Sequence, residues 1–263
     1  DNTLYSLLDN LAFIDENILS DSIFAKLLTS QYGLIFIANS ILIGFVLYYC
    51  IRLMFAQYLG NQVEKPYQFI IKCVICAICI NSSLFLCEQI LSINSLISGS
   101  ILELGSTILG KNISFNSLIE NSNRLISSAD SIDILSFTGI LKTLISFGLL
   151  NLLFSYSIRY ILTKVFILLC PFAVLSLTNI TSSWFFKSWL RNFLSLLLGQ
   201  SLVAVILLIV FSFNLSDNSI LLQISYISAI FVLVKSNNYM KELFGGISTD
   251  FNISLSNFKN LLR

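Results

Sequence analysis

Long apolar stretches separated by short polar ones dominate the chain. Tyr32 to Ile51 contains no charged residue, and a helix of that length crosses the roughly 30 Å hydrocarbon core of a bilayer at about 1.5 Å per residue. Three further stretches have a similar character: about Tyr67 to Leu86, Phe193 to Phe213, and Ser219 to Val234. The pattern therefore predicts an all-α, polytopic integral membrane protein.

Two stretches admit more than one interpretation. Leu135 to Leu177 has no turn signal before Pro171, so it is either one long kinked helix or two spans joined by a tight turn near Arg159. Ile90 to Leu109 is rich in Ser and Gly and contains Glu103. This polarity favours an interfacial or re-entrant segment over a span.

The polar stretches complete the expected organisation. Residues 4–30 alternate apolar positions with acidic ones, which is typical of amphipathic helices, and 111–133 carries a weaker helical stripe. In chain order, we expect an amphipathic extracytoplasmic amino-terminal segment (1–30), the first two transmembrane helices (31–87), an extracytoplasmic central region (88–133), the carboxyl-terminal transmembrane helices (134–234) and a cytoplasmic amphipathic tail (235–263).

The distribution of Lys and Arg predicts the orientation, because short cytoplasmic loops collect these residues. If Leu135 to Leu177 crosses once, the loop Arg52–Lys72, the pair Lys187 and Arg191, and the basic tail all lie inside. This arrangement has about five crossings, an external amino terminus and an internal carboxyl terminus. Two crossings there would give six spans and export most of these charges. The first residue is not Met, which either a removed leader or the choice of starting point explains.

Composition argues against most enzymatic chemistry. Of the residues, 56% are hydrophobic and 11% charged, the net charge is +1, and there is no histidine. We therefore expect no catalytic, metal or cofactor site and no sequence-specific binding of nucleic acid. Cys73, Cys76 and Cys79 have C-x-x-C spacing, but inside an apolar stretch they are interpreted as packing residues.

Charged and polar residues inside apolar stretches are the candidate functional residues, because burying them in lipid is costly. Arg159 and Lys164 either line a polar pathway or contact another subunit, or else mark a cytoplasmic turn. Gln200 and other polar residues within spans favour bonding between helices, which predicts a symmetric homo-oligomer. Four residues are expected to be anchors at the lipid headgroups, namely Trp184, Trp189, Lys187 and Arg191.

The region from Leu149 to Val210 resembles the TrbL-type polytopic inner-membrane subunit of type IV secretion systems. The resemblance is carried by an apolar helix with an embedded base, RYILTKVFILLCPFAVLSL, an aromatic and basic turn, SSWFFKSWLRNF, and a Gln-bearing helix, LLLGQSLVAVILLIV. It implies a non-enzymatic channel or scaffold subunit in the bacterial inner membrane that supports substrate passage and pilus assembly. The implied partners are membrane lipid, further copies of the chain, and other secretion subunits, including pilin and minor pilin.

Two other interpretations fit the same pattern. In an ion or small-solute channel or transporter, Arg159 and Lys164 would act as selectivity charges. A holin-like protein that forms membrane lesions is the third possibility, and the length of the chain and its polar loops argue against it.

Overall fold

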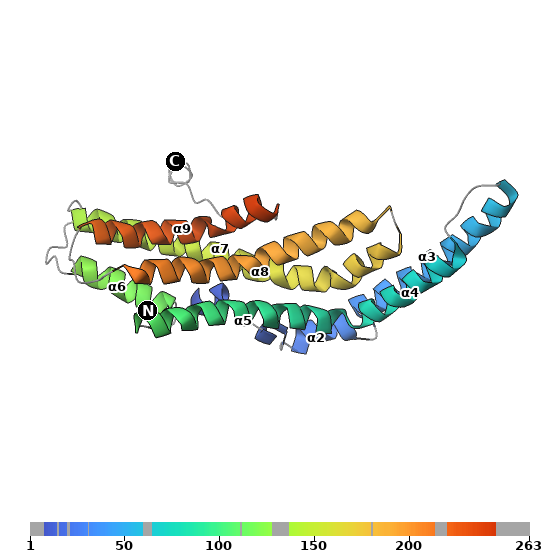
Figure 1. Ribbon diagram of the computed structural model, residues 1–263, viewed down its shortest axis with the longest axis horizontal. Coiled ribbons are helices and arrows are strands. Elements are labelled where there is room, and N and C mark those ends of the chain that lie inside the picture. Colours follow the sequence, from blue (N-terminus) through green and yellow to red (C-terminus); the bar gives the residue numbers. More distant parts are fainter. Residues whose placement is uncertain are drawn as a thin grey trace, which may run out of the picture. The chain divides into compact units, whose positions relative to one another are not determined.

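A computed structural model describes residues 8–14, 16–19, 22–30, 32–59, 65–110, 112–127, 137–179, 181–213 and 220–245. In these ranges the chain is helical with short connections and forms no strand (Figure 1). Residues 8–12 are helical, and the elements that follow are η1 (Glu16–Leu19), α2 (Ser22–Thr29), α3 (Leu34–Leu59), α4 (Pro66–Asn81), α5 (Ser83–Leu109), α6 (Phe115–Ser127), α7 (Phe137–Leu175), η2 (Ser176–Thr178), α8 (Ser183–Ser212) and α9 (Ile220–Phe244). The predicted all-α class is confirmed.

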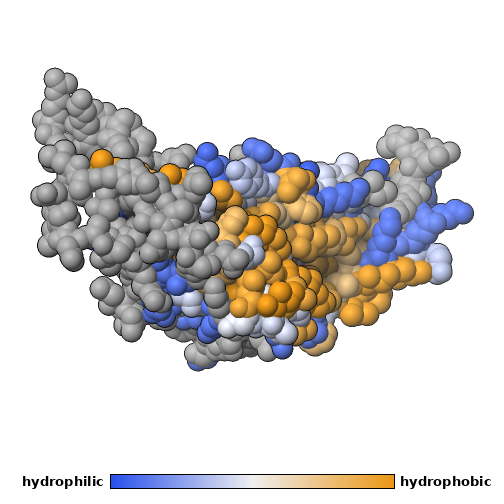
Figure 2. Space-filling model, turned by 60° about the vertical axis from the view of Figure 1, so that its left-hand side comes forward, coloured by the Kyte–Doolittle hydropathy of each residue, from blue (hydrophilic) through white to orange (hydrophobic). Residues whose placement is uncertain are grey.

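Four stretches of the described chain are long and apolar enough to cross a membrane. They are Lys26–Tyr58, Ser83–Leu109, Lys142–Thr178 and Ser183–Ser212, and two shorter apolar helices are Pro66–Asn81 and Ile224–Ser236. The exposed surface agrees with this assignment. Large apolar side chains of α3 such as Ile43, Met54 and Phe55 are exposed, and Figure 2 shows exposed apolar residues at the centre of the face in view. A helix that is apolar all round and yet exposed is suited to lipid.

The long apolar segment forms one helix from Phe137 to Leu175. α7 runs unbroken for 39 residues through Arg159 and Pro171, so no turn lies near Arg159. Its length is about 58 Å, nearly twice the thickness of the hydrocarbon core. Of the two arrangements that the sequence allows, the structure therefore has the single long helix.

The stretch from Ile90 to Leu109 differs from its expectation. It forms the larger part of α5, which is long and apolar enough to span, instead of a separate interfacial segment. Its hydroxyl groups bond within the helix: Ser98 donates to the carbonyl of Asn94 at 3.0 Å, and Thr107 donates to that of Glu103 at 2.9 Å. Because such bonds satisfy hydroxyls without breaking the backbone pattern, Ser-rich sequence is compatible with a continuous helix.

The chain does not reverse between α4 and α5. At the junction, the amide of Ser82 bonds to the carbonyl of Ile78, and the amide of Leu86 bonds to the carbonyl of Ser82, each at 3.0 Å. These are the bonds of an α-helix. α4 and α5 thus run in the same direction. The five-crossing arrangement requires this, because it has a single crossing between α3 and α6.

The chain divides into two compact units. The first contains residues 1–14, 93–162 and 194–263, and the second contains residues 15–92 and 163–193. In the first unit α7, α8 and α9 lie side by side (Figure 1), and the hydroxyl of Ser195 donates to the carbonyl of Met240 at 3.3 Å. Its apolar core includes Phe115 of α6, Tyr156 of α7 and Leu207 of α8.

The second unit pairs α3 with α4. The rings of Tyr49 and Phe69 stack with centroids 3.9 Å apart, and the amide of Asn39 donates to the side-chain oxygen of Asn81 at 3.1 Å. The thiol of Cys76 contacts the carbonyl oxygen of Val174 at 3.8 Å. Cys76 is thus buried against a neighbouring helix, in agreement with its interpretation as a packing residue.

Candidate functional site: a buried polar cluster around residues 8–14

Residues 8–14 belong to the first unit, and one side of the segment is buried in it. Leu8 and Ala12 are completely buried, and Ile14 is nearly so. The ring of Phe13 lies 6.3 Å from that of Phe115, which in turn meets Tyr156 edge to face at 5.9 Å. Apolar packing therefore places the segment, and its backbone polar groups need partners in the interior.

Arg159 of α7 is the first partner of the backbone of residues 8–14. Its Nη2 donates to the carbonyl of Leu11 at 3.3 Å and to the carbonyl of Ala12, and its guanidinium carbon lies 4.7 Å from the centre of the Tyr156 ring. Leu11 and Ala12 end a helical turn, so their carbonyls lack partners in that turn and form the negative end of its dipole. A buried guanidinium is stabilised by such oxygens and by the aromatic face.

Gln200 of α8 is the second partner of this backbone. Its Oε1 accepts from the amide of Ile14 at 3.1 Å and from Nδ2 of Asn94 at 3.1 Å, while its Nε2 donates to the hydroxyl of Ser98 at 2.8 Å. Asn94 and Ser98 lie one helical turn apart on α5, so both reach the same side chain. One amide thus joins α5, α8 and residues 8–14. We call Arg159, Gln200, Asn94 and Ser98 the polar cluster.

Asp9 makes a third connection, at the start of α6. Its Oδ1 accepts from the amide of Phe115 at 3.1 Å, and the hydroxyl of Ser114 accepts from the amide of Ser117 at 3.1 Å. These acceptors satisfy amides that a helix start leaves without partners. Burial raises the pKa of the Asp9 carboxyl above its ordinary value, although the hydrogen bond from Phe115 opposes this shift.

The polar cluster holds a segment in place and shows no arrangement suited to a metal. Arg159 and Gln200 each bond to the backbone of residues 8–14, and all four members of the cluster are buried. Among the described residues, no group of three or more His, Cys, Asp or Glu side chains is placed to hold a metal ion. The cluster therefore has a structural role: its hydrogen bonds join the amino-terminal segment to the three long helices α5, α7 and α8.

The other predicted residues belong to the second unit. Nζ of Lys164 lies 5.8 Å from the ring centre of Phe24 on α2. Trp184, Lys187 and Arg191 are exposed along one face of the first turns of α8, a placement open to lipid headgroups. Trp189 is instead buried, and its indole N–H donates to the carbonyl of Phe166 at 2.8 Å. A buried indole of this kind holds α7 to α8.

Polar residues from which we predicted a homo-oligomer find partners within the chain. Gln200 bonds to α5 and to Ile14, and Asn81 bonds to Asn39 and to the carbonyl of Ala77. The side-chain oxygen of Asn151 is buried and has no hydrogen-bond partner among the described residues. These contacts remove part of the reason for expecting bonds between subunits, and the oligomeric state stays a prediction.

The chain matches no protein-family model and no curated protein. The likeness to type IV secretion subunits therefore stays a hypothesis from the sequence. The structure adds the positions of its motifs: the base Arg159 and Pro171 lie on α7, the aromatic and basic residues begin α8, and Gln200 lies further along α8.

Proposed function

We propose that this chain is a non-enzymatic channel or scaffold subunit of a type IV secretion apparatus in the bacterial inner membrane. The observation that carries the proposal is the order of motifs from Leu149 to Val210, a helix with an embedded base and Pro171, an aromatic and basic helix start, and a Gln-bearing helix. Two polar residues of this order, Arg159 and Gln200, bond to residues 8–14. The motif residues thus act together on one segment, which favours a shared role over coincidence.

The proposed orientation has the amino terminus outside and the carboxyl terminus inside. Unbroken α7 and the forward-running junction of α4 with α5 support about five crossings. This orientation places the exposed Lys187 and Arg191 on the cytoplasmic side and α6 on the external side. The external side is also where pilin and minor pilin would meet the subunit.

The proposed mechanism is that residues 8–14 form a fixed element of the scaffold. Arg159 and Gln200 hold the segment against α5, α7 and α8, so a pull on the segment by an external partner would be transmitted to the long helices. In the alternative, a channel or transporter, Arg159 would face a conducting path. Arg159 is completely buried against backbone carbonyls, and this placement favours the scaffold.

A deletion and complementation experiment tests the proposal. Removing the gene from its bacterium should abolish transfer of the secreted substrate and reduce pili, and the parental chain should restore both. A copy with Gln200→Leu should insert into the membrane yet restore transfer poorly. Normal transfer and piliation without the gene would reject the proposal, and ion conductance by the purified chain in liposomes would then favour the channel.

A further inference from the structure

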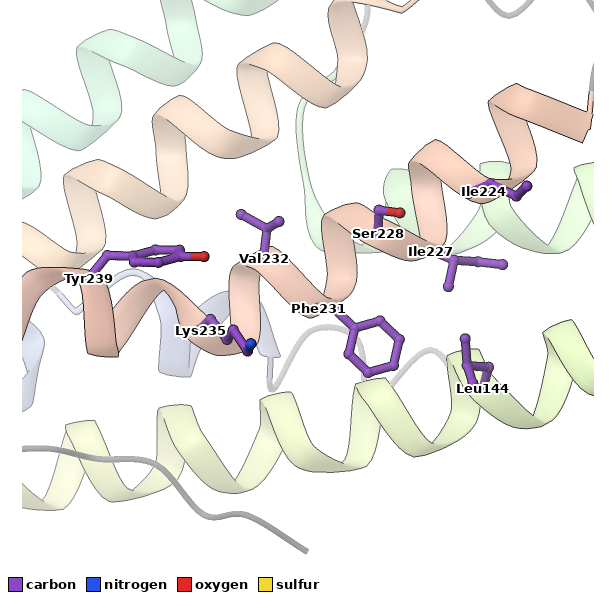
Figure 3. Close-up of a pocket in the computed structure, with 8 residues that line it drawn as sticks. All are labelled: Leu144, Ile224, Ile227, Ser228, Phe231, Val232, Lys235 and Tyr239. Carbon is purple, nitrogen blue, oxygen red and sulfur yellow. The ribbon is translucent and has the colours of Figure 1, made fainter. Parts of the chain in front are cut away.

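A groove of about 510 Å³ opens beside α9 in the first unit (Figure 3). All but one of its lining residues come from a single face of α9, and the exception belongs to α7. The lining residues are Leu144, Ile224, Ile227, Ser228, Phe231, Val232, Lys235 and Tyr239. The volume lies in the range of sites that bind small molecules.

Apart from Ser228, the floor and walls of the groove are apolar. Figure 3 shows Ile227 and Phe231 pointing from α9 toward α7, and Leu144 pointing back from α7. Ile227 is buried and forms the floor, whereas Ile224 and Val232 are exposed at the sides. The groove is therefore open along its length to whatever surrounds the helices, and in an apolar helix of this kind the surroundings are lipid tails.

Polar groups gather at one end of the groove. Lys235 and Tyr239 are both exposed there, one turn apart on α9. The axial distance from Ile224 to Lys235 is roughly 16 Å, which matches one leaflet of a hydrocarbon core about 30 Å thick. An ammonium group and a phenol at that distance from the apolar end lie at the level of lipid headgroups.

We propose that this groove binds an anionic phospholipid of the surrounding bilayer, with one acyl chain against Ile227, Phe231 and Leu144 and the phosphate at Lys235. An elongated apolar floor that ends in a cation and a hydroxyl is complementary to an acyl chain that ends in an anionic headgroup. In the proposed orientation the Lys235 end faces the cytoplasmic leaflet, where anionic lipids concentrate. The site itself depends only on residues of α7 and α9, so it stands independently of the secretion function.

Native mass spectrometry of the whole chain in mild detergent tests the site. The probes are phosphatidylglycerol and phosphatidylcholine with identical acyl chains, titrated separately. We expect one phosphatidylglycerol molecule to bind more tightly than phosphatidylcholine. Lys235→Gln should weaken the binding of phosphatidylglycerol about fivefold and leave that of phosphatidylcholine unchanged. Leu144→Trp, which places a large ring over the groove, should weaken the binding of both lipids.

Lys65→Gln is the matched control, because it removes another exposed cation, just before α4 in the other unit. It should leave both affinities at the parental value. Equal binding of the two lipids, or equal loss in Lys235→Gln and Lys65→Gln, would overturn the proposal. Formation of a disulfide between two copies by Ser228→Cys, in a background lacking the native cysteines, would also overturn it, because a second protein would then occupy the groove.

Discussion

The guanidinium of Arg159 donates to the carbonyl of Ala12, so a charge in the middle of the longest helix is bonded to the backbone of the amino-terminal segment. The two residues are 147 positions apart in the sequence. Nη2 of the buried Arg159 therefore finds its acceptors within the same chain, in oxygens at the end of a helical turn.

Replacing Arg159 with Leu should detach this end of the segment. The substitution removes the donor from the buried carbonyl of Ala12 and the partly buried carbonyl of Leu11, which costs about 1–3 kcal/mol. We expect normal membrane insertion, faster hydrogen exchange in residues 8–14 by mass spectrometry, and reduced secretion. Arg191→Leu, at an exposed site, is the control and should leave exchange unchanged. Parental exchange in Arg159→Leu would mean that packing alone holds the segment.

The effects of substituting Arg159 and Gln200 on the free energy of unfolding should be coupled, because both side chains bond to the backbone of residues 8–14. Gln200→Leu deprives Ile14, Asn94 and Ser98 of a partner and should cost about 1–3 kcal/mol alone. Once the segment is released by one substitution, the second removes fewer surviving bonds. A double-mutant cycle on unfolding free energies in detergent should therefore give a coupling of about 1 kcal/mol or more. Strict additivity would indicate that the two residues act separately.

The sequence predicted the residues of this site better than their partners. A charge at Arg159 and an amide at Gln200 stand out in apolar stretches because each needs a polar environment in lipid. Two of the groups that bond to Arg159 are backbone carbonyls, which every residue carries, so no side-chain pattern marks Leu11 and Ala12. A carboxylate partner would stand out in the sequence, but Glu103 of α5 is exposed.

For the fold, too, the sequence predicted some features and missed others. Apolar stretches predicted the helical membrane class correctly, because a backbone surrounded by lipid must satisfy its polar groups internally and a helix does so. The continuity of α5 was missed, since hydroxyl groups that bond within a helix look like a polar loop in the sequence. The burial of Trp189 was also missed, because composition alone cannot tell an indole at the headgroups from one that bonds to the carbonyl of Phe166.

Two glycines should respond oppositely to alanine. A Cβ at Gly148 of α7 would lie 2.9 Å from Cγ2 of Ile230, so Gly148→Ala should separate α7 from α9 and destabilise the protein by about 1–2 kcal/mol. At Gly99 of α5 a Cβ meets nothing within 4 Å, and alanine should stabilise the helix by up to about 1 kcal/mol. Thermal unfolding in detergent measures both. Destabilisation by Gly99→Ala would indicate that another copy packs on that face.

Asp9 should make stability depend on pH. Its pKa is raised by burial, so the folded protein favours the neutral carboxyl more than the unfolded chain does. The resulting stabilisation is fully present below the ordinary carboxyl pKa of about 4 and is lost as the pH rises through the raised value. Asp9→Asn keeps an oxygen for the amide of Phe115 but does not titrate. The Tm of the parent relative to Asp9→Asn should therefore fall as the pH rises over this interval, whereas a constant difference would contradict the assignment.

Labelling of single cysteines in intact cells should establish the orientation. Basic segments collect on the cytoplasmic side, and the unbroken α7 leaves one crossing between α6 and the start of α8. In a background without the native cysteines, a membrane-impermeant thiol reagent should therefore modify a cysteine at Asn121 of α6. It should spare one at the exposed Lys187 of α8 and one at Lys259, which lies outside the described residues. All three should react after the membrane is permeabilised, which serves as the control. External labelling at Lys187 would require an even number of crossings between α6 and α8, and the five-span orientation would then be wrong.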